Sequence, residues 1–459
     1  MNNRDLLLGV LLIVVVSTSL FLSHIAWWRL YDNIDAIEAE TTVLKTVDLA
    51  SVIAPGRAVL HFGQDIHSVV YPYSPLYGKI WEFVKNILSE GEFTGVKNPI
   101  NPESFRQKKG LELFFSTPLP VDFLTKVFNM REGQQAIPHD RLAGSIIIVE
   151  DNGLSVFLKG TGNEFYSLKN KEDSSELRQL LEQVVAENPR LYTYLPPAKI
   201  NVRFEEGIYV PVSDDENDLF IFTFKREKKL GQSGIAKFFP DFSITRRIEE
   251  KDGAVIYTDG NRGLRIYPDG ALEYSRPVPS DSKLKLSFYE ALSLAVNFIN
   301  THGGWPGEAY LSSYKTSKAQ GTVYTFNFGV RVRGLPLLGQ NYITVTVEGN
   351  QVSRYYRKIV REDRILEKIQ PISPIQALDA AIATGNLKEV KSLDLAYVIF
   401  ENTLSPVWAV KSTDVGDISA QGTMDYSAGA KVYSQNQYKE VFINAKNGVV
   451  INLQSGVGY

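Results

Sequence analysis

The pattern of hydrophobic and polar positions changes sharply near the start of the chain. Residues 6–28 carry no formally charged side chain, whereas the rest of the chain mixes apolar and polar positions. About 20 apolar residues span the roughly 30 Å hydrocarbon core of a bilayer, and a signal-peptide core is shorter, about 7–15 residues. Trp27 and Trp28 stand where a headgroup interface is expected. The pattern predicts a cytoplasmic tail at 1–5 and a retained transmembrane helix at 6–28.

The orientation of this helix is predicted from the charges beside it. The N-terminal amine and Arg4 lie on one flank, partly offset by Asp5, and Arg29 on the other is followed by acidic residues. Positive charge favours the cytoplasmic side. We therefore expect the N-terminus in the cytoplasm and the bulk of the chain outside the cell.

One face of the predicted membrane helix could contact another helix. Ser19 and Ser23 form a small-xxx-small pair, and Gly9 and Val16 lie near the same face. Small residues at this spacing let two helices approach closely in a membrane. These four residues are our candidates for a partner-binding surface.

A possible stalk follows at residues 29–54. Apolar or small side chains recur there at alternating spacings of four and three: Leu30, Ile34, Ile37, Thr41 and Leu44. This is the seam of a heptad pattern, although it covers only two heptads. A helical stalk and an amphipathic linker that lies on the next domain both fit.

The region 55–196 has the alternation of a mixed α and β domain. Strand-like runs occur at 58–63, 68–73, 111–116, 145–150 and 154–159, with helical periodicity at 75–88 and after Ser174 and Ser175. Pro196 and Pro197 mark its end. The next region, 197–281, is predicted to be rich in β-structure. It has strand-like runs at 219–224 and 254–258, a short helix at 235–239 and Asp-Gly turn signals at 252, 259 and 269.

The last region contains an internal repeat. Ser287, Ala291, Leu292 and Ala295 recur 86 positions later as Ser373, Ala377, Leu378 and Ala381. Each set lies on an amphipathic helix that begins at a serine cap, and hairpin signals follow at 343–347 and 441–444. A duplicated helix-on-sheet unit is predicted, at 282–368 and 369–459. The expected fold class is α+β: a membrane helix, then several antiparallel sheet-plus-helix domains, the last a tandem duplication.

The composition excludes several kinds of functional site and argues against one class of partner. The chain of 459 residues has no cysteine, which excludes disulfides, a thiolate nucleophile and a cysteine-based zinc site. Its net charge of −3 argues against nucleic-acid binding, which needs a concentrated basic surface.

Motifs for catalysis or ligand binding are incomplete. His61 and His67 are expected to flank a turn between strands rather than to bind a metal. The other glycine-rich and acidic segments lack a residue that their motif requires; they lie at 160–162, 231–234, 334–340 and 214–218. We predict no catalytic, cofactor or metal site.

The middle region resembles the YycH family. The resemblance rests on 237–243, Arg246, 252–253, 256–264, Tyr274 and Pro277, and the terminal region is similar to YycI and PepSY-type modules. YycH proteins are membrane-anchored regulators of the WalK (YycG) sensor kinase in Firmicutes and carry no enzyme site. The resemblance implies that the membrane helix packs beside the membrane helices of a sensor histidine kinase. It also implies that the outer domains pair with a YycI-type regulator.

Two other functions remain open on the residues alone. An anchored extracytoplasmic enzyme would need a buried nucleophile or a pair of carboxylates about 5–9.5 Å apart in a large pocket. A PepSY-like protease inhibitor would act through the repeated region, 281–459.

Overall fold

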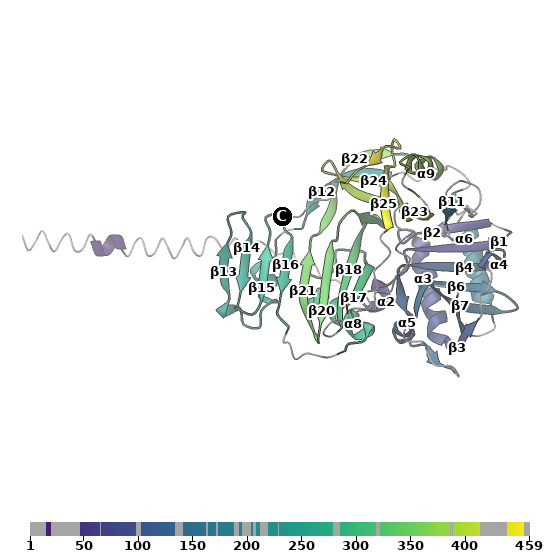
Figure 1. Cartoon of the computed structure of the whole chain (residues 1–459), viewed down its shortest axis with the longest axis horizontal. Helices are drawn as coiled ribbons and strands as arrows, with labels where there is room; N and C mark the ends of the chain where they lie inside the picture. Colours follow the sequence, from purple (N-terminus) through teal and green to yellow (C-terminus); the bar gives the residue numbers. More distant parts are fainter. Residues whose placement is uncertain are drawn as a thin grey trace, which may run out of the picture.

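Two β-sheets and the helices packed on them make up the described part of the chain (Figure 1). The computed structural model describes residues 15–19 and 46–453, except 65, 98–101, 134–140, 162–163, 171–172, 188–191, 195–202, 205–207, 212–218, 228, 279–284, 318–321, 386, 388 and 414–437. The α+β fold class with large antiparallel sheets is confirmed.

The first sheet comes mainly from the N-terminal region. Its order is β11-β9-β2-β1-β4-β6-β7-β8-β3-β5, and its neighbouring strands are antiparallel except β3 and β5. The strands are β1 (Arg57–Gly63), β2 (Ile66–Val70), β3 (Glu92–Lys97), β4 (Lys109–Pro120), β5 (Arg131–Glu132), β6 (Leu142–Glu150), β7 (Leu154–Gly160), β8 (Phe165–Lys169), β9 (Tyr192–Tyr194) and β11 (Tyr209–Pro211). The β2 strand is shorter than expected because Pro72 lacks a backbone N–H and the chain turns between Tyr71 and Ser74.

Helices of this region pack apolar side chains on both faces of the sheet, because Phe105 joins Ile147 and Val149 on the face opposite Ile146 and Ile148. They are α2 (Leu49–Val52), α3 (Pro75–Glu90), α4 (Pro102–Arg106), α5 (Val121–Val127) and α6 (Ser175–Ala186). The Ser74 hydroxyl caps α3 and Pro75 takes its first turn, a position where proline loses no helical hydrogen bond. At α6 the cap differs from expectation: the Asp173 carboxylate, rather than Ser174, accepts from the Ser175 N–H at 2.8 Å.

The second sheet runs through the rest of the chain. Its main order is β13-β14-β15-β16-β21-β20-β18-β19-β23-β24-β12-β22. Its strands are β10 (Arg203–Phe204), β12 (Leu219–Arg226), β13 (Arg246–Glu249), β14 (Val255–Thr258), β15 (Gly263–Ile266), β16 (Leu272–Ser275), β17 (Ala309–Ser317), β18 (Val323–Val332), β19 (Leu335–Leu338), β20 (Ile343–Glu348), β21 (Gln351–Arg357), β22 (Val360–Ile369), β23 (Glu389–Phe400), β24 (Thr403–Thr413), β25 (Tyr438–Asn444) and β26 (Val450–Ile451).

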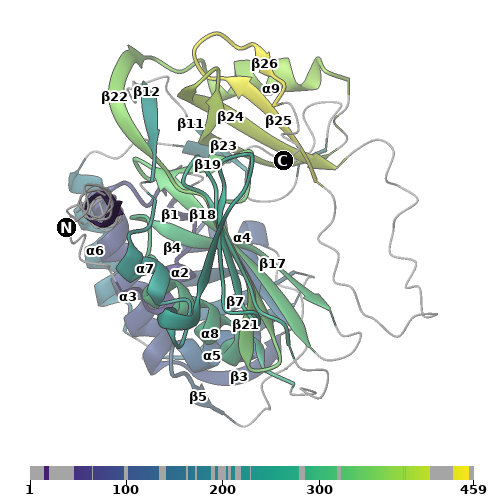
Figure 2. The same ribbon diagram turned by 90° about the vertical axis from the view of Figure 1, so that its left-hand side faces the viewer.

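Each half of the repeated region places a helix on its own strands. The helix α8 (Phe288–Thr301) packs on β18, β20 and β21, and α9 (Pro374–Ile382) packs on β24 and β25. Both helices begin with a capping box, Ser287 with Glu290 and Ser373 with Gln376. In Figure 2 the second copy, with α9 and β23–β26, lies at the top of the molecule. The domain boundaries themselves stay a prediction.

The middle region contributes to both sheets. The strand β11 extends the edge of the first sheet beside β9, while β13–β16 form a meander that continues the second sheet beyond β21. This meander lies at the opposite end of the molecule from the N-terminal sheet (Figure 1). The middle region also contains α7 (Gln232–Ala236), near the expected helix at 235–239, and a 3-10 helix (Phe242–Ile244), both before the meander in the chain.

Asp-Gly turns shape the meander as expected. The glycines Gly253, Gly260 and Gly270 have φ of +83°, +92° and +85°, a region that favours glycine. The Asp259 carboxylate accepts from the Arg262 N–H at 2.7 Å. At Gly270 a Cβ atom would lie 2.4 Å from the Glu227 carbonyl oxygen, so this position also needs a residue without a side chain.

Candidate functional site

The predicted partner-binding face lies mostly outside the described residues. Gly9 and Ser23 are not described, as is most of the predicted helix at 6–28. Val16 and Ser19 lie on a helical turn at 15–19 with exposed side chains, 49% for Val16. Among the helices that the structure describes, none has both the length and the apolar character of a membrane span. The contact of this face with another helix stays a prediction.

The chain that follows the predicted anchor docks on the first repeat copy. Most of the predicted stalk, 29–45, lies outside the described residues. The next segment is held by Asn300 of α8, whose amide accepts from the Val47 N–H at 3.1 Å and donates to the Val47 carbonyl at 3.2 Å. The Trp305 indole N–H donates to the same Asn300 oxygen at 2.6 Å. Asn300 thus binds the segment at 46–53, here called the entry segment, to the first repeat copy. No local sequence signal predicted this contact.

The N-terminal sheet domain also packs against both repeat copies. Phe123 of α5 meets Phe288 of α8 edge to face, with ring centroids 4.9 Å apart. Arg57 of β1 forms an ion pair with Asp394 of β23 at 3.3 Å. Buried apolar side chains from both regions join in one large cluster. These contacts join segments far apart in the sequence.

Gly334 has a structural role at this junction rather than a phosphate-binding role. Its φ is +76°, and a Cβ there would lie 2.0 Å from the Cβ of Tyr73 in the N-terminal region. The glycine lets the two backbones approach. The element after this segment is the strand β20.

Two histidines that the sequence places beside a turn face each other in the first sheet. His61 of β1 and His67 of β2 are a directly opposed pair, and their Nδ1 atoms lie 2.9 Å apart. Both side chains are buried. Tyr209 of β11 covers them, with ring centroids 6.2 Å and 5.1 Å away. Register across the hairpin brings the pair together, and the six-residue spacing alone did not show it.

Charged groups surround the two imidazoles. The Arg106 Nε–H of α4 donates to the Tyr209 hydroxyl at 3.1 Å, and Glu112 of β4 accepts from the Ser145 hydroxyl at 3.1 Å. Burial, His67 and the Arg106 guanidinium hold the pKa of His61 well below its ordinary value of 6.5. Within the described ranges, no group of three or more His, Cys, Asp or Glu side chains is arranged to hold a metal ion.

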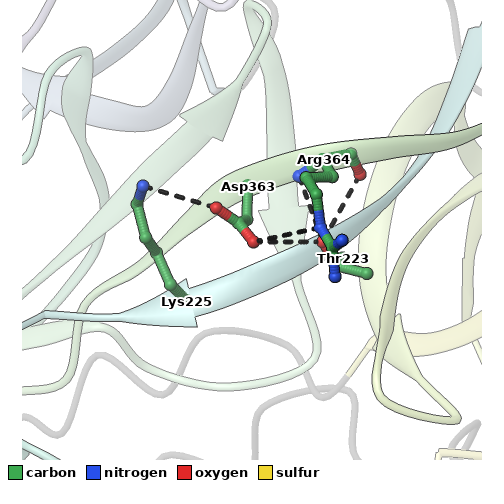
Figure 3. A network of polar contacts seen from close by, with 4 residues as sticks. All are labelled: Thr223, Lys225, Asp363 and Arg364. Atoms are coloured by element: carbon green, nitrogen blue, oxygen red, sulfur yellow. Dashed lines mark hydrogen bonds and ion pairs between the residues drawn. The ribbon is translucent and has the colours of Figure 1, made fainter.

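A two-stranded ribbon of β12 and β22 connects the repeat copies and carries many charges. Asp363 lies 3.5 Å from the Lys225 ammonium and 3.8 Å from the Arg364 guanidinium, and the Arg364 N–H donates to the Thr223 hydroxyl at 3.0 Å (Figure 3). Charges on the terminal strand of a sheet discourage further strands from pairing with it. The ribbon is therefore suited to a solvent-facing connection.

The remaining candidate segments have ordinary structural roles or lie outside the described residues. Gly231 begins the short helix α7, and the Gly160 N–H closes a turn by donating to the Glu164 carbonyl at 2.8 Å. Gly162 and the acidic segment at 214–218 are not described.

Comparison with solved structures identifies the fold. The chain is similar to YycH in the crystal structure of YycH from Bacillus subtilis, with a TM-score of 0.59 and 15% sequence identity. The match covers 80% of this chain and 96% of that chain. This chain has the YycH fold. The expectation drawn from residues 237–277 is thereby confirmed at the level of the fold. No protein-family model matches the chain, and no curated protein does.

Proposed function

We propose that the chain is a membrane-anchored, non-enzymatic regulator of a sensor histidine kinase of the WalK (YycG) type. The observation that carries the proposal is the shared fold, which extends over 96% of the YycH chain. The apolar segment at 6–28 supports attachment to a membrane, with the folded domains on the extracytoplasmic side.

The way in which the entry segment is bound supports a mechanical coupling between the outer domains and the predicted membrane helix. Val47 is bound to α8 through Asn300, and α2 packs on α8 and β17. A shift of the outer domains would then move the chain that leads to the membrane helix. Such a shift changes kinase activity only if the helix contacts the two kinase states with different free energies.

The proposed contact surface in the membrane is the face of Gly9, Val16, Ser19 and Ser23. In this proposal the helix packs beside the kinase's membrane helices, while the outer domains pair with a YycI-type regulator. Small residues permit the close approach that such packing needs.

Substitution of the small residues by leucine tests the proposal. Full-length Ser19→Leu/Ser23→Leu and a matched Thr18→Leu variant, which lies on the opposite side of the helix, are each expressed with the kinase in membranes. We expect co-purification of the kinase to fall about tenfold for the double variant, which corresponds to about 1–2 kcal/mol of helix packing. Kinase autophosphorylation should change with it, and Thr18→Leu should match the wild type.

Two outcomes would contradict the proposal at different levels. Unchanged co-purification and autophosphorylation in the double variant would exclude this face. A wild-type chain that neither binds the kinase nor changes its autophosphorylation would exclude kinase regulation itself.

A further inference from the structure

The buried histidine pair constrains its own protonation. An imidazole Nδ1 facing another Nδ1 at 2.9 Å requires one donor and one acceptor, so the contact holds a single proton between the two rings. His61 and His67 are 1% and 0% exposed, so water does not solvate an added charge. The contact is made by a neutral pair.

The strands that close over the pair are held by few backbone contacts. β11 lies at the edge of the first sheet and has three residues, Tyr209–Pro211. It pairs with β9, and β9 meets β2 at the single register pair of His67 and Tyr192. This edge is therefore fixed largely by packing: Tyr209 lies against the imidazoles and against Val59 and Val69, and α9 packs on β11.

The charges facing the pair come from every neighbouring element. α4 supplies the Arg106 guanidinium, β4 supplies Glu112, β1 supplies Arg57, which is engaged with Asp394, and β11 supplies Tyr209. Burial raises the pKa of Tyr209, so its phenol is neutral. A proton added to the imidazoles would place a new cation beside Arg106 in a buried site, which is unfavourable.

We propose that His61, His67, Arg106 and Tyr209 form an acid-released latch, which holds the β9–β11 edge on the β1–β2 hairpin at neutral pH and releases it when the imidazole pair is protonated. The proposal goes beyond kinase regulation and does not depend on it. It assigns to the outer domain a conformational change that extracellular acidification would trigger.

The direction of the pH effect follows from the lowered pKa of His61. In the released edge the imidazole regains its ordinary pKa of about 6.5, so the released state binds more protons than the latched state below that pH. The latch is at full strength above about pH 6.5. It weakens as the pH falls from 6.5 toward the lowered pKa of the latched state.

Hydrogen exchange of the full-length chain in detergent micelles tests the latch. Exchange is measured at pH 7.5 and pH 5.5 and corrected for the intrinsic pH dependence of amide exchange. We expect peptides that contain Tyr209 or His67 to exchange at least about tenfold faster at pH 5.5, which is the effect of one pKa unit. Peptides from α8 should change little.

Variants separate the latch from general acid instability. His61→Asn/His67→Asn removes both titratable groups and should remove the acid response of the Tyr209 peptides. His67→Asn alone should reduce that response, which keeps the test decisive if the double variant fails to fold. His302→Asn is the control, because His302 is a partly buried histidine of the first repeat copy; the latch should still respond to acid in this variant.

The proposal is overturned if the wild-type Tyr209 peptides show no acid-dependent acceleration. It is equally overturned if the His67→Asn variant keeps the full acid response.

Discussion

The two copies of the helix-on-sheet unit begin alike and end in different surroundings. Both helices start at a serine with a reciprocal capping box, yet α8 has 14 residues and α9 has 9. The first helix is contacted by α2 and α5, from outside its own copy. The second is contacted by β11 of the first sheet and leaves Ile375 42% exposed. The same capping box therefore starts a helix in both copies, while the surroundings of each helix decide which other parts of the molecule contact it.

The first copy holds three other parts of the molecule together. It meets the N-terminal domain through Phe288, the entry segment through Asn300, and the β13–β16 meander through pairing of β16 with β21. The second copy meets the first sheet through packing of α9 on β11 and through the Arg57–Asp394 ion pair. It meets the middle region through pairing of β23 with β10 and of β24 with β12. Phe288 packs among several aromatic rings, whereas the Arg57–Asp394 ion pair is partly exposed, so we expect the Phe288 contact to contribute more to stability than the ion pair.

The largest expected effect is that of Phe288→Ala. Its ring packs against Phe123, Tyr314 and Phe326, and removal should lower the free energy of unfolding by about 3–5 kcal/mol. The matched position in the second copy is Pro374, where Pro374→Ala should cost about 0.4–1 kcal/mol. Urea unfolding of the full-length chain in detergent measures both. Equal losses of unfolding free energy in the two variants would contradict the expectation that Phe288 contributes more to stability than Pro374.

A smaller effect is expected for Asn300→Ala. The change removes both hydrogen bonds to Val47 and the acceptor of the Trp305 indole, which should cost about 1–3 kcal/mol. The loss should be local, with faster hydrogen exchange in peptides that contain 46–53. Asn297→Ala, an exposed site on the same helix, is the control. If both variants exchange alike, Asn300 does not hold the entry segment.

The smallest effect is expected at the contact of the second copy. Arg57 and Asp394 are 15% and 30% exposed, so a double-mutant cycle with Arg57→Met and Asp394→Asn should give a coupling of about 0.2–1 kcal/mol. The coupling should decrease in 1 M salt because screening weakens exposed charges. A coupling as large as the effect of Phe288→Ala would show that the second copy holds the domain as firmly as the first.

Much of the secondary structure could be predicted because it depends on near neighbours. The caps at Ser287 and Ser373 and the Asp-Gly turns of the meander follow from residues a few positions apart. The resemblance over 237–277 likewise led to the YycH fold, which the solved structure of YycH bears out. The membrane face at Gly9, Val16, Ser19 and Ser23 stays a prediction.

The pairing of distant strands could not be predicted in the same way. Alternating apolar positions show that a segment is a strand. They do not identify the strand with which it pairs, because many strands offer the same pattern of backbone donors and acceptors. The return of β11 to the first sheet and the continuation of β21 by β16 are of this kind. So is the meeting of His61 with Tyr209, 148 positions apart in the chain.

The sequence by itself determined where several helices and turns begin, that four residues of one helix recur 86 positions later in another, and that residues 6–28 are apolar enough for a membrane. These properties depend on side chains within a few turns of each other and on composition. Only the tertiary structure decided which copy holds the entry segment and which side chains surround His61 and His67. Those contacts arise when strands far apart in the chain compete for the same sheet edges, and burial of the whole core selects one arrangement.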